Sequence, residues 1–277
     1  MATVKALVIG GGGGGNYGGW GAGWYQYDPA LTVTPQAYTV TVGNWWTWWT
    51  TSASINDRSG WNSVFSTITG NWWGGWIATG NNGISWWSWS GANSSWTAST
   101  WWSWTQWSAG WNISSWFTAY YPSGWGGWSS SAGWSVTNPS SVGGNWGNGT
   151  SNSISWTAVT YAWWGGWGVH ATLWTAGSGW TGWGGNGAII SGTASNWTDW
   201  LGGGWGGSWN WWIGWTGWKW VVIISYATDG SDGVSPTSTG GTITTSGGQT
   251  IHTFTSSWTF TMVASSITTN SNFLMFF

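Results

Sequence analysis

The sequence has almost no charge, no cysteine and no long apolar run. Its 277 residues include three Lys or Arg and five acidic residues, all of them Asp. Three cations give no electrostatic footprint for nucleic acid. Without cysteine the chain has no disulfide framework, thiolate nucleophile or zinc–thiolate site. The aliphatic run at residues 6–9 is too short for a bilayer span or a signal-peptide core. We therefore expect no nucleic-acid partner and no membrane span.

Glycine and tryptophan dominate what is present. With 50 Gly and 41 Trp, these two types make up about a third of the chain, whereas Gly alone averages about 7% in proteins. Except for Trp258, the Trp residues lie between residues 20 and 220, and they stand where glycine would be expected, as in WWGGW at 72–76 and WWGGWG at 163–168. Reading Trp as Gly turns these stretches into runs like the all-glycine run at 10–15.

So many tryptophans are physically unfavourable. Each can bury roughly 150–250 Å², while a folded monomer of 29.9 kDa has a total surface of only about 12,000 Å². Many rings would face water on a chain with little charge, which favours aggregation. We therefore hypothesise that most Trp residues are UGA codons that the source decodes as glycine, as some bacterial lineages and their viruses do. The alternative is a genuinely Trp-rich protein, whose codons would be UGG.

Strand patterns occur at both ends of the chain. Residues 1–9, 31–42 (entered after Pro35), 62–68 and 219–226 predict strands, and 242–263 predict a small antiparallel unit with strands near 242–245, 250–255 and 259–263 and turns at 246–248 and 256–258. Between residues 70 and 220 the chain is of low complexity, without helical or strand periodicity.

The sequence thus predicts a mainly β and irregular fold with essentially no helix. It divides by composition into four parts: a glycine-rich domain (1–226), a linker (227–240), a small Thr-rich β-unit (241–264) and an apolar C-terminal tail (265–277).

No pattern predicts catalysis, a cofactor or a metal. His170 and His252 are the only histidines, and neither has a neighbouring Asp or His to complete a triad or metal site. The strand and glycines at 6–15 imitate a dinucleotide-binding turn, but no helix follows them. The acidic stretch 229–233 (DGSDG) is isolated, so we interpret it as a solvated turn and not as a calcium repeat. An enzyme is the least favoured class.

With Trp read as Gly, five stretches resemble the glycine-rich domain proteins of bacteriophages and bacteria, which are similar to the polyglycine domains of phage tail-fibre adhesins. Their order along the chain carries the resemblance: VKALVI with the glycines at 4–15, YTVTVG at 38–43, WNSVF at 61–65 with the run at 72–76, VVIISY at 221–226, and GGTITT at 240–245 with IHTFT at 251–255.

The resemblance implies a polyglycine II-like bundle flanked by short strands. Such helices have no internal hydrogen bonds, so their backbones must pair with one another and approach closely. It also implies a non-enzymatic structural or adhesion protein of the virion tail that contacts a host cell-surface receptor, glycan or protein, or other tail proteins. The alternatives are a structural protein of a bacterial cell surface or extracellular matrix, or a carbohydrate-binding module if the Trp are genuine.

Polar insertions between the glycine blocks are the candidate receptor-contact loops. We place them at residues 50–59, 117–123 and 135–142, with Asn56, Asp57, Arg58, Tyr120, Tyr121 and Asn138 as the candidate contact residues.

Overall fold

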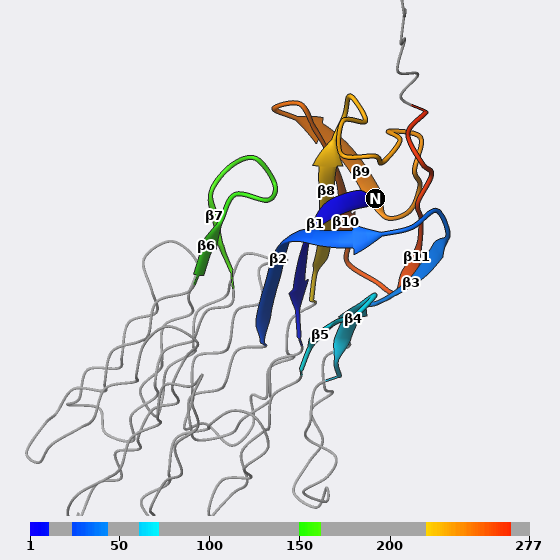
Figure 1. The fold of residues 1–277 in the computed structure, drawn as a ribbon. Coiled ribbons are helices and arrows are strands. Elements are labelled where there is room, and N and C mark those ends of the chain that lie inside the picture. Colours follow the sequence, from blue (N-terminus) through cyan, green and yellow to red (C-terminus); the bar gives the residue numbers. More distant parts are fainter. Residues whose placement is uncertain (11–23, 44–60, 72–149, 162–219, 267–277) are drawn as a thin grey trace, which may run out of the picture.

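The computed structural model describes residues 1–10, 24–43, 61–71, 150–161 and 220–266 (Figure 1). These residues contain no helix, and 58% of them lie in antiparallel strands. The predicted mainly β, helix-free fold is confirmed for this part of the chain. The predicted polyglycine II-like bundle falls largely on 72–149 and 162–219, outside the described residues.

The apolar strands form the middle of a five-stranded sheet. Its order is β2 (Tyr25–Val33), β1 (Ala2–Ile9), β8 (Val222–Ala227), β10 (Gln249–Phe254) and β9 (Thr242–Ser246). The aliphatic residues of β1 and β8 are buried in successive positions, which continuous apolar runs predict. The Thr-rich β9 lies at one edge and is exposed along its whole length.

A second sheet has the order β11 (Trp258–Thr261), β3 (Ala37–Thr41), β4 (Ser63–Phe65) and β5 (Ile68–Gly70). A separate hairpin is formed by β6 (Thr150–Asn152) and β7 (Val159–Tyr161). The phenol oxygen of Tyr25 accepts a hydrogen bond of 2.6 Å from the Asn152 amide, which ties this hairpin to β2.

The core contains an aromatic cluster with members from both sheets. Phe260 of β11 is fully buried, and its ring meets those of Phe65 and His252 edge-on, with centroids 5.9 and 5.1 Å apart. The ring of Tyr226 lies 6.4 Å from Phe260, and that of Tyr38 lies 6.5 Å away. These rings connect β3, β4 and β11 to β8 and β10, so the two sheets share one core.

The strand predicted at residues 1–9 is confirmed by β1, whereas the single strands predicted at 31–42 and 62–68 each require a correction. Residues 31–42 form the end of β2 and the whole of β3, because the chain breaks at Thr34, Pro35 and Gln36, where proline cannot donate to a ladder. Residues 62–68 form β4 and begin β5, and the turn between them places Ser66 at a φ of 53°.

The three C-terminal strands are present as predicted, but only the first two pair with each other, and the third belongs to the other sheet. β9 and β10 are joined by Gly247 and Gly248, whose φ angles of 55° and 75° suit a two-residue hairpin turn. The predicted turn at 256–258 is wrong at Trp258, which begins β11 opposite Val40 in the other sheet. The segment 242–263 therefore contributes strands to both sheets.

Residues 227–240, a linker by composition, pack against the sheets. Val234 and Ser238 are buried, and the Asp232 carboxylate accepts hydrogen bonds from the backbone N–H groups of Ala227 and Val234. A β-bridge joins Val234 to Ala264. The Asp232 carboxylate, which the sequence places in a solvated turn, thus fixes the conformation of this loop.

Residues 70–220 show no strand periodicity in the sequence, yet the structure forms the β6–β7 hairpin there. Tyr161 and Ile154 of this hairpin are buried in the core. Its strands have three residues each, which is too short for a periodic signal. The remainder of that stretch lies outside the described residues.

Candidate functional site

The strand ends that border the glycine- and Trp-rich segments lie together at one end of the β framework (Figure 1). The Ile9 N–H donates to the Val221 carbonyl at 3.2 Å, and the Gly10 N–H donates to the Trp24 carbonyl at 2.9 Å. The Trp24 N–H in turn donates to the Asn71 carbonyl at 3.3 Å. The borders at residues 9–10, 24, 71 and 221, where the chain leaves or re-enters the framework, are thus hydrogen-bonded to one another.

Two glycines allow this close approach. A Cβ on Gly10 would overlap the Asn71 carbonyl oxygen, and one on Gly43 would overlap that of Trp61. Both obstacles are backbone atoms, which cannot rotate away as a side chain would. Glycine is needed here for backbone proximity, one of its recurrent structural uses.

The N-terminal residues and residues 262–266 lie at the opposite end of the framework (Figure 1). The Thr3 N–H donates to the Asp232 carbonyl, and the Ser265 N–H donates to the Gly233 carbonyl, each at 3.0 Å. Ala2 lies beside Gly233, where an added Cβ would come within 3.1 Å of it. The framework is therefore bipolar, with the borders of the glycine-rich segments at one end and these terminal residues at the other.

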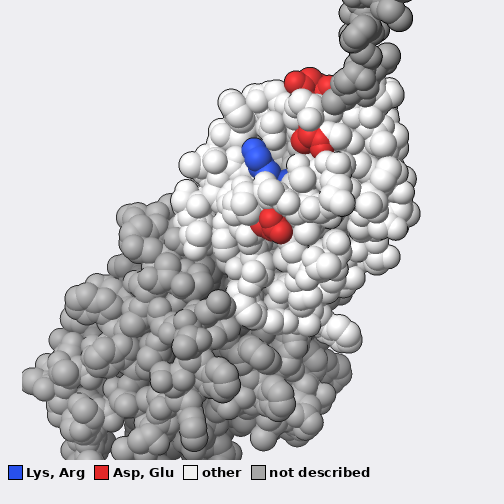
Figure 2. Space-filling view, viewed as in Figure 1, with Lys and Arg blue, Asp and Glu red and all other residues white. Residues whose placement is uncertain are grey.

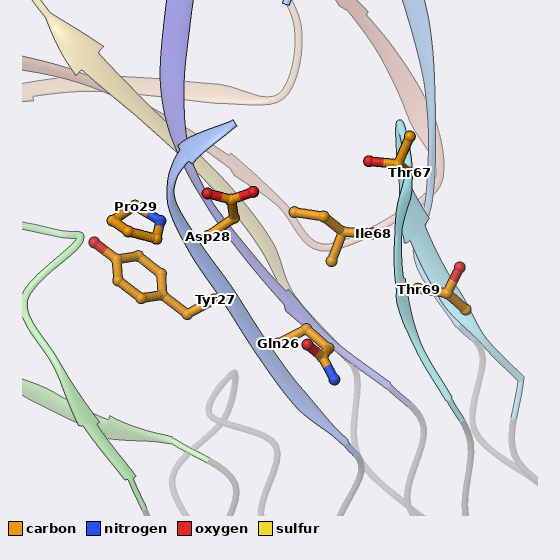
Figure 3. Close-up of a pocket in the computed structure, with 7 residues that line it drawn as sticks. All are labelled: Gln26, Tyr27, Asp28, Pro29, Thr67, Ile68 and Thr69. Carbon is orange, nitrogen blue, oxygen red and sulfur yellow. The ribbon is translucent and has the colours of Figure 1, made fainter. Parts of the chain in front are cut away.

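A polar cleft lies between β2 and β5, which are edge strands of the two sheets (Figure 3). It is open to solvent and has a volume of about 580 Å³. It is lined mostly by polar residues, namely Gln26, Tyr27, Asp28, Pro29, Thr67, Ile68 and Thr69. We call this feature the β2–β5 cleft.

An irregularity in β2 shapes this cleft. Val4 pairs with Leu31 and Ala6 with Asp28, so Pro29 and Ala30 together stand opposite one residue of β1. Such a bulge bends an edge strand. The Asp28 Oδ1 atom accepts a hydrogen bond of 2.9 Å from the Ala30 N–H across the proline, which fixes the carboxylate at the bulge.

Few charges lie on the described surface. They are Lys5, Asp28, Asp229 and Asp232, and Figure 2 shows the one blue and the red side chains on a single face. Lys5 Nζ donates to the Gln249 side-chain oxygen at 3.4 Å. Among the described residues, the lining of the β2–β5 cleft includes no cation. Burial raises the pKa of Tyr27, and the neighbouring Asp28 charge adds to this rise.

His252 belongs to the core and has no access to solvent. One ring nitrogen, Nδ1, lies 2.7 Å from the Gly240 carbonyl, which can only accept, so Nδ1 carries the proton. Nε2 then accepts from the Tyr226 hydroxyl at 2.8 Å. Burial lowers the pKa of His252 and raises the pKa of Tyr226 to about 12. Both groups stay neutral at pH 7 and serve the packing of the core.

This pair predicts a loss of stability in mild acid. Because the folded pKa of His252 is lower than the unfolded value of about 6.5, the unfolded chain binds a proton first as the pH falls. The contribution of neutral His252 to the free energy of unfolding is complete above about pH 6.5. It is lost as the pH falls from there toward the folded pKa of His252. We expect the urea midpoint of unfolding to decrease from pH 7 to pH 5, and His252→Phe to remove this slope. His170→Asn, which removes the other histidine, should retain it; a slope that persists in His252→Phe would contradict the assignment.

The sequence-predicted contact residues Asn56, Asp57, Arg58, Tyr120, Tyr121 and Asn138 all lie outside the described residues. The β2–β5 cleft was not predicted, since its two walls are separated in sequence by two strands. The one local signal was the Asp28-Pro29 pair, which favours a bend inside a strand. The stretch 229–233 is a hydrogen-bonded turn, in which Asp229 Oδ1 accepts from the Ser231 N–H at 2.9 Å.

No helix among the described residues is long and apolar enough to cross a membrane. Within the same ranges, no three His, Asp or Glu side chains are grouped so that they could hold a metal ion. Comparison of the chain with family models, curated proteins and solved structures found no match.

Proposed function

We propose that this chain is a non-enzymatic structural and adhesion protein, a component of a phage tail that presents receptor-contacting surfaces on a β framework. The observation that supports this is the bipolar framework. The borders of four glycine- and Trp-rich segments lie at one end, and the described terminal residues lie at the other.

A framework of this kind suits display. Binding residues are commonly placed on connecting segments that a rigid scaffold positions, and here the scaffold is two sheets with a shared aromatic core. Attachment through the terminal end would leave the other end free to contact a host surface. The partner would be a host cell-surface receptor or another tail protein, and the location would be the virion.

Binding of the purified full-length chain to a panel of bacterial strains tests this proposal. We expect saturable binding to one or a few strains, and loss of binding when residues 50–59, 117–123 and 135–142 are replaced by Gly-Ser segments of equal length. A matched control replaces residues 235–237 of the terminal end in the same way and should still bind.

Absence of saturable binding to every strain would favour the alternative, a structural protein of a bacterial surface or matrix without a specific ligand. Neighbouring genes give an independent check, because genes for tail or baseplate proteins beside this one are expected only under the tail proposal.

A further inference from the structure

We propose that the β2–β5 cleft binds a neutral carbohydrate. The inference rests on the adhesion function proposed above and names the ligand class of one of its surfaces. The cleft has a volume of about 580 Å³, which is within the usual range of small-molecule sites. None of its lining residues is Trp, so the identity of the lining does not depend on how the Trp codons are read.

The hydrogen-bonding groups of the cleft are available to a ligand. Asp28 Oδ1 is held by the Ala30 N–H, while Oδ2 makes no hydrogen bond within the described part of the chain. The side chains of Gln26, Thr67 and Thr69 are likewise without hydrogen-bond partners among the described residues. Figure 3 shows the Thr67 oxygen on the side of β5 that faces β2, whereas the Thr69 side chain points away from β2. Asp28, Gln26 and Thr67 thus offer a carboxylate that only accepts, and an amide and a hydroxyl that both donate and accept. A sugar hydroxyl, which donates one hydrogen bond and accepts others, complements this mixed set.

The arrangement of the side chains adds an apolar contact. Gln26 and Asp28 are two residues apart on β2 and therefore point to the same side of the strand. Figure 3 shows both on the side of β2 that faces β5, with Tyr27 and Pro29 on the other side, and the Ile68 side chain extends from β5 toward β2. Ile68 is half-buried and adds methyl groups to the β5 wall of the cleft. A pyranose ring combines polar edges with C–H faces, so both parts of the cleft would be matched.

Charge selects against anionic ligands. Asp28 is the one charged residue of the cleft lining, and no Lys or Arg lies among the lining residues. A phosphate, a uronic acid or a sialic acid would meet this carboxylate without a compensating cation, which is unfavourable in a partly desolvated site. The cleft therefore favours uncharged sugars.

An extended peptide fits less well. A peptide could add a strand to an exposed sheet edge, and β2 is such an edge. However, Pro29 lacks an N–H and the bulge at Pro29 and Ala30 interrupts the ladder, both of which are features that block strand addition. The side chains of the cleft remain the more suitable recognition groups.

Saturation-transfer NMR on the full-length chain tests the assignment. The probes are glucose, galactose, mannose and N-acetylglucosamine, with glucuronic acid as the anionic comparison. We expect transfer to at least one neutral sugar and weaker transfer to glucuronic acid. Gln26→Ala and Asp28→Asn should each weaken binding about tenfold, the size expected for one lost hydrogen bond to a charged or well-placed group. Asp28→Asn retains the Oδ1 acceptor for Ala30, and Asp229→Asn is the matched control outside the cleft.

No transfer to any neutral sugar at millimolar concentration would overturn the proposal, as would binding that Gln26→Ala and Asp28→Asn leave unchanged. Preference for glucuronic acid, or displacement of the sugar by an unrelated extended peptide, would also overturn it.

Cell binding distinguishes the two proposals. If variants that lose sugar binding still adhere to bacteria, the adhesion function stands and the cleft assignment fails; if the chain binds sugar but no bacterial strain, the cleft stands and the adhesion proposal fails.

Discussion

Decoding UGA as glycine is expected to convert this chain from an aggregating polypeptide into a soluble one. A literal reading places 41 Trp on a chain with 3% charged residues, so large apolar surfaces would be exposed with little charge to oppose association. Glycine at the same positions removes that surface, and the change affects the β framework at only five positions, since only five Trp lie among the described residues. The measurement is the soluble fraction, with size-exclusion chromatography, of the two forms expressed in parallel.

The environments of the described Trp support this expectation. Trp61, Trp156 and Trp258 are 64%, 56% and 65% exposed, and Trp220 is buried with an indole N–H that has no partner. An unpaired buried donor costs about 1–3 kcal/mol. Apart from Trp24, these residues show the two situations that a genuine Trp usually avoids: a large ring in water, and a buried polar group without a hydrogen bond.

One position has the backbone of a glycine. Trp156 has a φ of 75° and its N–H donates to the Ser153 carbonyl at 2.8 Å, which makes it the fourth residue of a turn, where glycine is favoured. Left-handed backbone costs a non-glycine residue about 1–2 kcal/mol. We therefore expect Trp156→Gly to be about 1 kcal/mol more stable than Trp156→Ala in urea unfolding, the reverse of the usual order.

Trp258 provides the opposite case. It is also largely exposed but lies in β11 without a positive φ, so Trp258→Gly should be less stable than Trp258→Ala. The same sign at both positions would contradict the backbone argument. UGG codons at most Trp positions, or Trp in the peptides of the native protein by mass spectrometry, would refute the recoding hypothesis itself.

The sequence predicted the elements that carry a strong apolar signal. β1 and β8 contain the two aliphatic runs, and the β9–β10 turn contains two glycines, so local pattern and turn chemistry were sufficient there. The short strands were less visible, because three residues of β6 or β7 show no period. Their position depends instead on a long-range contact, the hydrogen bond between Tyr25 and Asn152.

The cleft and the pairing of β11 depend on which strands become neighbours. β11 follows β10 in sequence but pairs with β3, more than two hundred residues away. Nothing local distinguishes these alternatives, since either pairing would satisfy the same backbone groups. What decides between them is the burial of Phe260 against rings from both sheets. The presence of Asp28 and Ile68 in one cleft between two sheet edges follows from that packing and could not be read from either segment alone.

Phe260→Ala is expected to destabilise the framework by about 3–5 kcal/mol, the usual cost of removing a buried phenylalanine. The ring is fully buried and contacts Tyr38 and Phe65 of one sheet and Tyr226 and His252 of the other. Its loss would leave a cavity lined by four aromatic rings, which cannot collapse without moving one sheet against the other. Urea unfolding followed by circular dichroism measures the change.

Neighbouring variants separate this role from a general effect on β11. Thr259→Ala and Thr261→Ala alter exposed side chains of the same strand and should stay within about 0.5 kcal/mol of the parent. Phe260→Leu keeps most of the volume and should cost clearly less than Phe260→Ala. A loss below about 1 kcal/mol for Phe260→Ala, smaller than the usual cost of a cavity, would mean that the two sheets are stable without their shared aromatic cluster. The bipolar framework would then have to be held by the backbone contacts around Gly10 and Gly43, where a Cβ has no room.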